Sequence, residues 1–456
     1  MNSYKNQRVV VLGLAKSGAA VAKLLHRFGA HVTVNDKKPR EEAIQAEELE
    51  ALGITVITGH HPDDLITQEV ALVVKNPGIP YEASPVKTAL DLGIPVVTEI
   101  EIASQLMKAP LIGITGSNGK TTTTTLTGLI LQEAGLQPVV AGNIGTPLSE
   151  IAEEVTEEQW VVAELSSFQL MGTQHFRPRI GILLNIYPAH LDYHHTMEEY
   201  LSAKRKMFMN QTETDYALLP YDQPETVQQV LPLKSKVYYF SCKHEVPRGV
   251  CVKAGNIVFV DDEGEEVIME REALSLPGEH NLENALAAIL ATKLAGADAQ
   301  SMRNVLTTFQ GVEHRLELVK TLAGVRYYND SKATNPQAAT RSIQTFSEPI
   351  VLIAGGLDRG TELLELVPVL RKHVKALVTF GQTAEILLKR AQEAGISRTA
   401  HVDTVEKAVE VAAQFAQSGD VVLLSPACAS WDMFPSFEVR GSIFKDAVHR
   451  LNTSLA

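Results

Sequence analysis

The residues best suited to chemistry form a glycine-rich run at 114–122, which reads Ile-Thr-Gly-Ser-Asn-Gly-Lys-Thr-Thr. An apolar stretch at 111–114 precedes the run, and a helix-like stretch at 123–133 follows it. A strand, a glycine-rich turn, a Lys-Thr pair and a helix are together typical of a nucleotide triphosphate cradle. The alternative is a glycine-rich turn with a surface lysine, which the flanking strand and helix disfavour.

Each part of this loop has a physical role in the predicted cradle. Gly116 and Gly119 allow backbone N–H groups to face phosphate oxygens. Lys120 adds positive charge at the outer phosphates, and the hydroxyl of Thr121 can hold Mg²⁺.

Further polar residues follow two other expected strands. Glu164 ends the apolar stretch 160–165, where its carboxylate can ligate Mg²⁺ beside Thr121; an ordinary surface glutamate is the alternative. His190 follows the expected strand at 180–186. A basic trio comes next, within an expected helix, and the residues alone do not choose among its members Lys204, Arg205 and Lys206.

The N-terminal region carries an incomplete dinucleotide fingerprint, Gly13-x-Ala15-x-x-Gly18. Ala15 replaces the glycine that brings a pyrophosphate closest to the backbone, so an ordinary turn between strand and helix stays an open alternative. Asp36 ends the next strand, where a ribose-binding acid would lie, and a tight loop occupies 76–79. Together these features indicate a nucleotide pocket, though not clearly one for NAD.

Several loops in the second half of the chain also follow expected strands or begin expected helices. They are His280–Asn284, His314-Arg315, Asp330–Asn335, Gly355–Gly360 with its Arg359, and Ser425–Phe434. In the first of them, Asn281 and Asn284 share one face of a helix. Each loop alone could be an ordinary turn, but their shared position at strand ends favours a ligand cleft.

The expected elements predict an α/β protein with three domains. We expect an N-terminal Rossmann-like βαβ domain at 1–106, a central P-loop ATPase-type domain at 107–310 and a C-terminal Rossmann-like domain at 311–456. The expected strands lie at 8–12, 31–35, 70–75, 95–98, 111–114, 160–165, 180–186, 325–328, 350–353, 376–380 and 421–424. Between them, 215–268 alternates in a β-like way and 281–294 forms a helix.

Composition narrows the function classes. A net charge of −13 over 456 residues argues against binding to nucleic acid or to an anionic membrane surface. The three cysteines lack zinc-site spacing and fit a reducing compartment. No signal peptide precedes the first expected strand and no apolar run is long enough to span a membrane, so we expect a cytoplasmic protein.

The combined motifs resemble the Mur ligases of peptidoglycan synthesis over essentially the whole chain. The markers are TGSNGKTT (115–122), GNIG (142–145), ELSSFQL (164–170), HLD (190–192), PGEHNLENALAA (277–288), HRLE (314–317), YNDSKATN (328–335) and SPACASWDMF (425–434). The loop variant T-G-[ST]-x-G-K-[ST] also occurs in folylpolyglutamate synthetases. NDSKATN together with SPACAS resembles the D-glutamate-adding group.

This resemblance implies an ATP-dependent ligase that adds D-glutamate to UDP-N-acetylmuramoyl-L-alanine. The substrate carboxylate would become an acyl phosphate, because a carboxylate is a poor electrophile until one oxygen becomes a good leaving group. The D-glutamate amine would then displace phosphate. Two Mg²⁺ ions and lysine would offset the negative charge of the reactants. A monomer is expected.

The resemblance also implies residue roles. Catalysis is assigned to Lys120, His190, Lys204 and Lys332. ATP binding is assigned to Gly116, Ser117, Asn118, Gly119, Lys120, Thr121, Thr122, Asn281, Arg315 and Asp330. UDP-sugar binding is assigned to Lys16, Ser17, Asp36, Lys37, Gly78 and Asn143, and D-glutamate binding to Thr334, Arg359, Ser430 and Phe437. Thr121 and Glu164 would bind one Mg²⁺, and His190 and a carbamylated Lys204 would serve the second.

Three other functions compete with this interpretation. A folylpolyglutamate-type ligase has the same phosphate loop, but that class begins directly at the ATP domain. A regulatory protein that hydrolyses ATP and joins nothing is disfavoured by the presence of His190, Lys204 and Lys332. An NAD oxidoreductase is disfavoured by Ala15 and by the lack of a second cofactor signature.

Overall fold

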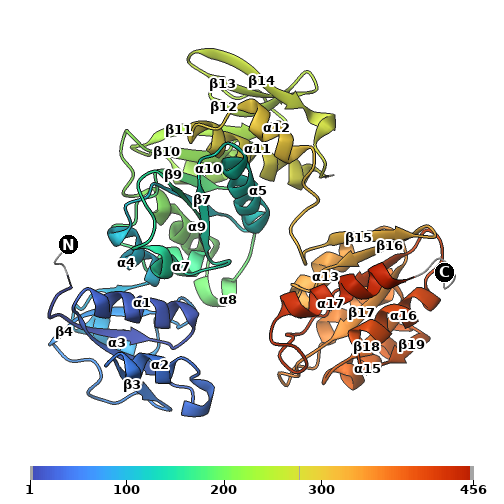
Figure 1. The fold of residues 1–456 in the computed structure, drawn as a ribbon, viewed down its shortest axis with the longest axis horizontal. Helices are drawn as coiled ribbons and strands as arrows, with labels where there is room; N and C mark the ends of the chain where they lie inside the picture. The colour runs from blue at the N-terminus through green and yellow to red at the C-terminus, as the bar shows by residue number, and fades with distance from the viewer. Residues whose placement is uncertain (1–3, 277, 452–456) are drawn as a thin grey trace. The chain divides into compact units, whose positions relative to one another are not determined.

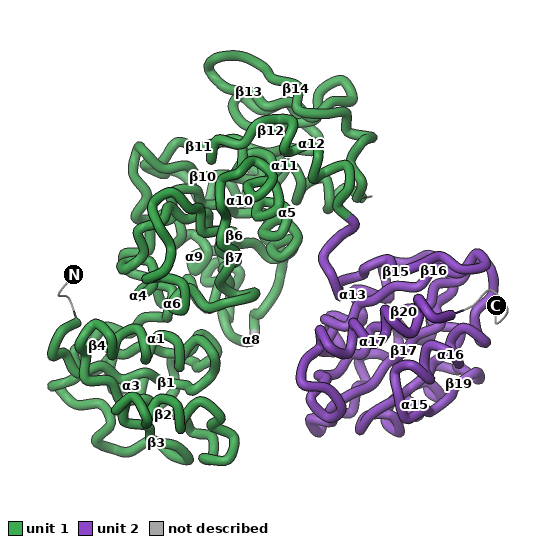
Figure 2. The backbone as a smooth tube through the Cα atoms, in the orientation of Figure 1, with its two compact units in different colours: residues 1–309 green, residues 310–456 purple. Residues whose placement is uncertain are grey.

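A computed structural model describes residues 4–276 and 278–451, together with the backbone but not the side chain of Asp192. Pro277, the first residue of one motif named above, lies outside the described residues. The chain divides into two compact units, residues 1–309 and 310–456, shown in green and purple in Figure 2. Each unit is described by itself.

The N-terminal sheet of the first unit is parallel, with the strand order β3-β2-β1-β4-β5 (Figure 1). Its strands are β1 (Arg8–Leu12), β2 (His31–Asp36), β3 (Thr55–Thr58), β4 (Val70–Lys75) and β5 (Val96–Val97). Its helices are α1 (Lys16–Arg27), η1 (Arg40–Glu42), α2 (Ala46–Ala51) and α3 (Ser84–Asp91). The strand order reverses direction between β1 and β4, the position where open parallel sheets bind ligands.

The second sheet of this unit has the order β14-β13-β12-β11-β10-β9-β6-β8-β7, parallel from β12 to β7 and antiparallel at the β12–β13–β14 end. Its strands are β6 (Leu111–Thr115), β7 (Pro138–Gly142), β8 (Trp160–Glu164), β9 (Ile180–Leu183), β10 (Tyr216–Pro220), β11 (Lys236–Ser241), β12 (Gly249–Lys253), β13 (Asn256–Asp261) and β14 (Gly264–Glu270). Its helices are α5 (Lys120–Glu133), α6 (Leu148–Ile151), α7 (Ser167–Met171), α8 (Leu191–His194), α9 (Met197–Arg205), η2 (Lys206–Phe208), α10 (Pro224–Val230), η3 (Arg271–Ala273), α11 (Glu279–Leu294) and α12 (Ala299–Leu306).

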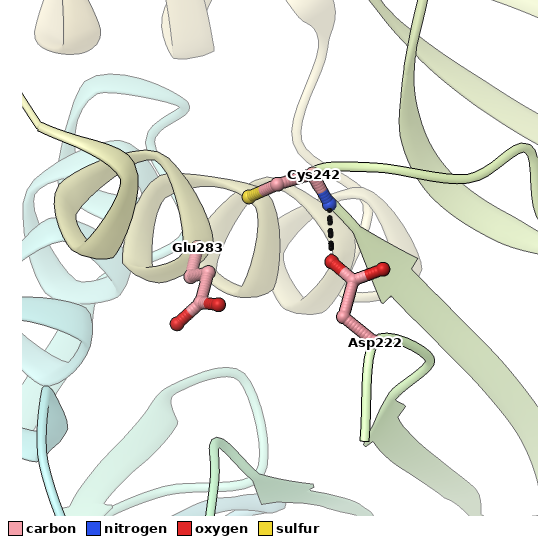
Figure 3. Close-up of side chains that lie close together, drawn as sticks. All are labelled: Asp222, Cys242 and Glu283. Atoms are coloured by element: carbon pink, nitrogen blue, oxygen red, sulfur yellow. Dashed lines mark hydrogen bonds between the residues drawn. The ribbon is translucent and has the colours of Figure 1, made fainter. Parts of the chain in front are cut away.

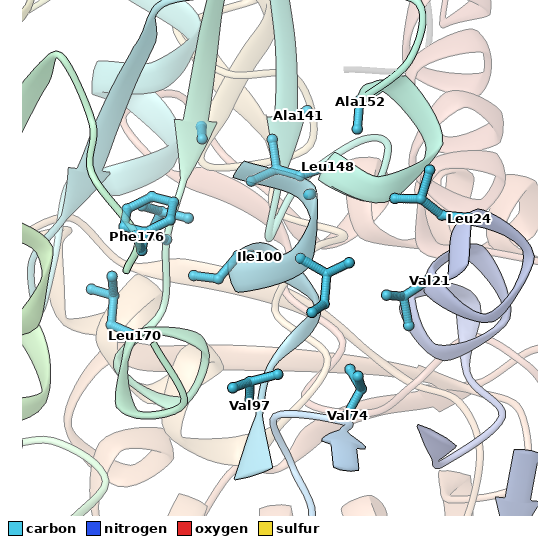
Figure 4. Packing of buried hydrophobic residues seen from close by; sticks show 14 of the residues in the cluster. Val21, Leu24, Val74, Val97, Ile100, Ala141, Leu148, Ala152, Leu170 and Phe176 are labelled. Carbon is cyan, nitrogen blue, oxygen red and sulfur yellow. The ribbon is translucent and has the colours of Figure 1, made fainter. Parts of the chain in front are cut away.

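Helix α4 (Glu99–Leu106) joins the two sheets through a shared core. Figure 4 shows its Ile100 between Val21 and Leu24 of α1 on one side and Leu170 and Phe176 on the other. These side chains are fully buried. The loops at the ends of β1 and β8 are therefore held by one continuous core rather than by a flexible linker.

The second unit contains one sheet with the order β15-β16-β20-β17-β18-β19, parallel except at β15–β16. Its strands are β15 (Glu317–Leu322), β16 (Val325–Asn329), β17 (Ile350–Gly355), β18 (Val374–Phe380), β19 (Arg398–His401) and β20 (Val421–Leu424). Its helices are α13 (Pro336–Gln344), η4 (Leu364–Leu366), α14 (Val367–His373), α15 (Ala384–Ala394), α16 (Val405–Phe415) and α17 (Phe437–Arg450).

The expected α/β class and the three α/β domains are confirmed by the three sheets and by the family models reported below. The domain boundaries at 106 and 310 stay predictions. Several expected bounds differ from the observed elements by one to three residues, and two of the differences matter for the site and the second sheet. The strand expected at 180–186 ends at Leu183, and helix α10 interrupts the β-like stretch at 215–268.

Candidate functional site

The glycine-rich loop leaves the carboxyl end of β6 and runs directly into α5. Gly119 has a φ of +83°, and a Cβ at this position would lie 2.1 Å from the Asn284 side-chain oxygen. Gly116 is also in the positive-φ region, and a Cβ there would lie 2.9 Å from Cβ of Leu184. Both glycines are thus required by backbone conformation and by close approach.

Two ammonium groups converge on this loop. The Nζ of Lys120 donates to the carbonyl oxygens of Gly116 at 2.9 Å and Ser117 at 3.0 Å. The Nζ of Lys204 donates to the same Gly116 oxygen at 3.0 Å and to the Thr115 hydroxyl at 3.2 Å. Burial, and secondly the charge of Lys120, lower the pKa of Lys204 well below its usual value. Phosphate oxygens here would relieve the repulsion between the two cations.

The sequence did not choose among the three basic residues Lys204, Arg205 and Lys206. In the structure their side chains point to different partners. Lys204 is 1% exposed and contacts the phosphate loop. Arg205 donates to the Val230 carbonyl at 3.2 Å, and Lys206 donates to the Met171 carbonyl at 2.5 Å. Among the three, Lys204 is therefore the one whose described contacts include the loop.

A short chain of hydrogen bonds connects the loop to Glu164. The Thr121 hydroxyl donates to Oε2 of Glu164 at 2.8 Å, and the Asn143 amide donates to Oε1 at 2.8 Å. Glu164 is 2% exposed at the end of β8, and β8 pairs directly with β6. Its buried carboxylate and the Thr121 hydroxyl are hard oxygen donors beside a phosphate loop, which fits the oxygen preference of Mg²⁺.

His190 is the N-cap residue directly before α8, has a left-handed φ of 56° and lies at the protein surface. Its ring meets the ring of Phe168 edge to face, with centroids 5.0 Å apart. Its predicted metal role stays a prediction.

A pocket of about 600 Å³ opens beside Asn143. It is lined by loops at the carboxyl ends of β1, β4, β7 and β8, together with Tyr193 of α8. Four residues of the predicted UDP-sugar set line it: Lys16, Ser17, Gly78 and Asn143. The Lys16 ammonium reaches across to the Gly145 carbonyl at 3.3 Å. The pocket is thus built from both sheets of the first unit.

The other two members of that set do not line this pocket. The Asp36 carboxylate accepts hydrogen bonds from the backbone N–H groups of Leu14 at 2.7 Å and Lys38 at 2.9 Å. Asp36 therefore stabilises the loop after β1 through hydrogen bonds to the backbone. Lys37 is exposed.

Residues predicted for the nucleotide and the amino acid are divided between the two units. Ser117 and Asn118 are in the loop, Thr122 follows in the first turn of α5, and Asn281 is in the first turn of α11. In the second unit, Asp330 follows β16, is 3% exposed and accepts from the Ser425 hydroxyl at 2.9 Å. Burial raises the pKa of Asp330 to about 6.

The remaining predicted residues of the second unit gather around three neighbouring strands. Lys332 and Thr334 follow β16, Arg359 follows β17, and Ser430 follows β20. Phe437 begins α17, and the Lys332 ammonium lies 5.5 Å from the centre of its ring. Arg315 is exposed in the segment before β15.

Family models cover most of the chain. Residues 7–98 match the N-terminal domain of MurD-like Mur ligases, residues 114–292 match the Mur ligase middle domain, and residues 314–428 match the Mur ligase glutamate ligase domain. A protein from Geobacillus sp. (strain WCH70) is 51% identical to this chain, and the alignment covers 98% of each. The chain belongs to the Mur ligase family.

Other relatives have similar coverage. Proteins from Geobacillus kaustophilus (strain HTA426) and Bacillus pumilus (strain SAFR-032) are 52% and 50% identical to this Mur ligase, over 98% and 99% of each chain. These two and the Geobacillus sp. protein are named UDP-N-acetylmuramoylalanine--D-glutamate ligase. The solved structure of UDP-N-acetylmuramate-alanine ligase from Thermotoga maritima has a TM-score of 0.54 at 19% identity, covering 97% of this chain and 99% of its own, which shows the shared fold.

Two residues that contact the glycine-rich loop of this Mur ligase were not predicted as site residues from the sequence. Asn185 accepts from the Asn118 N–H at 2.9 Å and, through its carbonyl, from the Ser117 N–H at 3.0 Å. Asn284 fills the space beside Gly119. Asn185 lay inside the strand expected at 180–186. A polar residue near the end of an apolar strand was the sequence signal that could have identified it. Asn284 was noted only for the face that it shares with Asn281.

One group of possible metal ligands lies outside these predictions, counting only residues 4–276 and 278–451. Figure 3 shows Asp222, Cys242 and Glu283, whose ligand atoms lie within 4.8 Å of one another. Burial, and then the carboxylates of Glu283 and Asp222, raise the pKa of the Cys242 thiol to about 12. Both Asp222 oxygens already accept hydrogen bonds, from Ser241 and from the Cys242 N–H. We assign no metal to this group, because a thiol ligand must lose its proton.

Among the described residues, each helix of the Mur ligase is either too short or too polar to cross a membrane.

Proposed function

We propose that this Mur ligase uses ATP to join D-glutamate to UDP-N-acetylmuramoyl-L-alanine in peptidoglycan precursor synthesis. Relatives that are 50–52% identical over nearly their whole length carry the name of this activity. The structural observation that carries the proposal is the bridge from Asn143 through Glu164 to Thr121.

This bridge connects two binding regions. Asn143 lines the 600 Å³ pocket, and Thr121 belongs to the phosphate loop. A sugar nucleotide bound in the pocket can therefore extend its carboxylate toward the outer phosphate of a nucleotide in the loop. Both reactants are anionic, and the ammonium group of Lys120 offsets part of the charge that would keep them apart.

The proposed reaction has two steps. The substrate carboxylate attacks the γ-phosphate, giving an acyl phosphate and ADP. The amine of D-glutamate then attacks the acyl carbon, and phosphate leaves with the C–O bonding electrons. Lys120 holds the phosphates, and Lys332 in the second unit neutralises charge at the transferred group.

Two Mg²⁺ ions complete the proposal. Thr121 and Glu164 would hold one, while His190 and a carbamylated Lys204 would serve the other. Mg²⁺ supplies positive charge to the phosphate oxygens when it is bound. The low pKa of Lys204, caused by burial, favours the neutral amine that can add to CO₂ with loss of a proton, which converts a cation into an anionic oxygen donor.

The remaining assignments complete the proposed ligand sites. The UDP-sugar site comprises Lys16, Ser17, Gly78 and Asn143, with Asp36 and Lys37 at its edge. The ATP site comprises 116–122 with Asn281, Arg315 and Asp330, and the D-glutamate site comprises Thr334, Arg359, Ser430 and Phe437. We propose domains at 1–106, 107–310 and 311–456, a cytoplasmic location, a monomeric state and no nucleic-acid partner.

The test is a ligation assay with ATP, Mg²⁺, UDP-N-acetylmuramoyl-L-alanine and a panel of amino acids, read by mass spectrometry. We expect D-glutamate to be joined, with one ADP formed per product, and L-glutamate to be rejected. Joining of L-lysine, meso-diaminopimelate or L-alanine instead would contradict the proposal at the level of the family member.

A further inference from the structure

An exposed tryptophan lies beside a predicted substrate-binding arginine in the second unit. Trp431 is 66% exposed, and the guanidinium carbon of Arg359 lies 5.3 Å from the centre of its ring. Arg359 is itself exposed. A large aromatic side chain that is exposed to solvent next to a cation calls for an explanation, because burying the aromatic ring would stabilise the folded protein more.

The fold brings these two residues together at one edge of the sheet. Arg359 follows β17 and Trp431 follows β20, and these two strands pair in parallel. On the other side of β20 lies β16, which is followed by Thr334. Since parallel strands end at a common edge, the three loops form one surface of the kind where open α/β sheets bind ligands.

The two loops are held rigidly against each other. The Leu357 N–H donates to the Ala429 carbonyl at 2.9 Å. The buried Arg440 guanidinium donates to the Cys428 carbonyl at 3.1 Å and to the Gly355 carbonyl at 3.4 Å. The contact between Arg359 and Trp431 thus lies between two loops whose backbones are hydrogen-bonded to each other two to four residues away.

A guanidinium on an aromatic ring keeps a useful set of donors. When its flat face lies on the ring, its N–H groups point outward in the guanidinium plane. Those N–H groups match the two oxygens of a carboxylate. Stacking also removes rotamers that a free arginine would lose on binding, which lowers the entropic cost of holding the ligand.

We propose that Trp431 is a positioning residue that orients Arg359 toward the side-chain carboxylate of D-glutamate. This inference rests on the proposed function and deepens it. Trp431 acts through Arg359, and it contributes to the apparent affinity for the amino acid rather than to the chemical step.

Kinetics test the proposal. Trp431→Ala should raise KM for D-glutamate about two- to five-fold, the range of an exposed cation–π contact, with kcat and the KM for ATP unchanged. Trp431→Phe should retain most of the affinity. Met433→Ala, at an exposed neighbour in the same loop, is the matched control and should behave as the parent protein.

A double-variant cycle separates positioning from a general loop defect. If Trp431 acts through Arg359, adding Trp431→Ala to Arg359→Ala should raise KM for D-glutamate no further. Additive effects, an unchanged KM in Trp431→Ala, or an equal rise in the KM for ATP would overturn the proposal.

Fluorescence gives a readout independent of turnover. The chain has two tryptophans, and Trp160→Phe leaves Trp431 as the single emitter. D-glutamate added to that variant, in the presence of the UDP substrate and a non-hydrolysable ATP analogue, should change the emission saturably, and L-glutamate should not. No change with D-glutamate would contradict the proposal. Failure of the parent protein to ligate D-glutamate would instead contradict the proposed function.

Discussion

The loops after β1 and β6 share one architecture but differ in charge. Both connect a buried parallel strand to a helix through glycines. After β6, the side-chain nitrogens of Lys120 and Lys204 donate to one carbonyl oxygen, and the buried Glu164 carboxylate accepts from Thr121. After β1, Lys16 instead reaches across the pocket to Gly145. Concentrated positive charge suits a triphosphate, whereas a looser arrangement suits a sugar diphosphate.

The largest expected effect comes from removing charge at the β6 loop. Lys120→Ala should lower kcat/KM for ligation about 10³-fold, because Lys120 is a fixed cation where negative charge develops. The assay is ADP release coupled to product formation. Lys108→Ala, at an exposed lysine just before β6, is the control. Near-normal turnover by a folded Lys120→Ala protein would refute the loop assignment.

The second effect separates two lysines of the basic trio. Lys204→Ala should lower kcat about 10²-fold or more, with partial rescue by acetate or formate, which can supply an anionic oxygen in place of the proposed carbamate. Lys206→Ala should change kcat far less, because its ammonium binds the Met171 carbonyl. Strong loss only in Lys206→Ala would show that the charge convergence at Gly116 has another role.

The third prediction compares two glycines with equal backbone strain. Gly119 and Gly53 both have a φ of +83°, but a Cβ at Gly53 meets nothing within 4 Å, whereas at Gly119 it meets Asn284. Gly53→Ala should cost about 1 kcal/mol of unfolding free energy, and Gly119→Ala about 3 kcal/mol.

Urea denaturation followed by Trp160 fluorescence, in a Trp431→Phe background, measures both costs in the first unit. Equal losses of unfolding free energy in the two variants would mean that the close contact between Gly119 and Asn284 of α11 does not constrain the glycine-rich loop.

The fourth prediction concerns the support of the pocket. Glu99, the first residue of α4, is 3% exposed and accepts a hydrogen bond from the Ser149 N–H at 2.6 Å. Ser149 belongs to α6, which begins directly after the pocket residue Pro147. Burial raises the pKa of Glu99 to about 7. Its contribution to stability is therefore full below its unfolded pKa near 4.5 and is lost as the pH rises through 7.

Glu99→Gln should remove this pH dependence. Between pH 4.5 and 7, the unfolding free energy of the parent should fall by up to about 3 kcal/mol more than that of the variant. Urea titrations at several pH values check the difference. Parallel pH profiles would show that Glu99 is ionised in the folded protein.

Much of this comparison could be predicted from the sequence, because each loop is a continuous run of residues after a strand. The buried strands β1, β4 and β20 match their expected bounds, since they are nearly continuous apolar runs. The strands β3, β7, β15 and β19 were not predicted. All four are sheet edges whose mixed burial hides the pattern.

The direction in which each side chain points could not be predicted from the sequence. Lys204 and Lys206 are two residues apart, and only packing sends one to the phosphate loop and the other to Met171. Asp36 has the expected position at the end of β2, yet its carboxylate bonds the backbone rather than lining the pocket. Pairing between distant segments, such as Asn185 with Asn118, likewise depends on the folded sheet.

The most direct test of the division between the β6 and β1 loops is equilibrium binding of ATP and of UDP-N-acetylmuramoyl-L-alanine to two variants by calorimetry. Lys120→Ala should lose ATP binding and retain the UDP substrate. Lys16→Glu should weaken the UDP substrate and retain ATP. The reverse pattern, or loss of both ligands in both folded variants, would contradict the assignment of the two loops to different ligands.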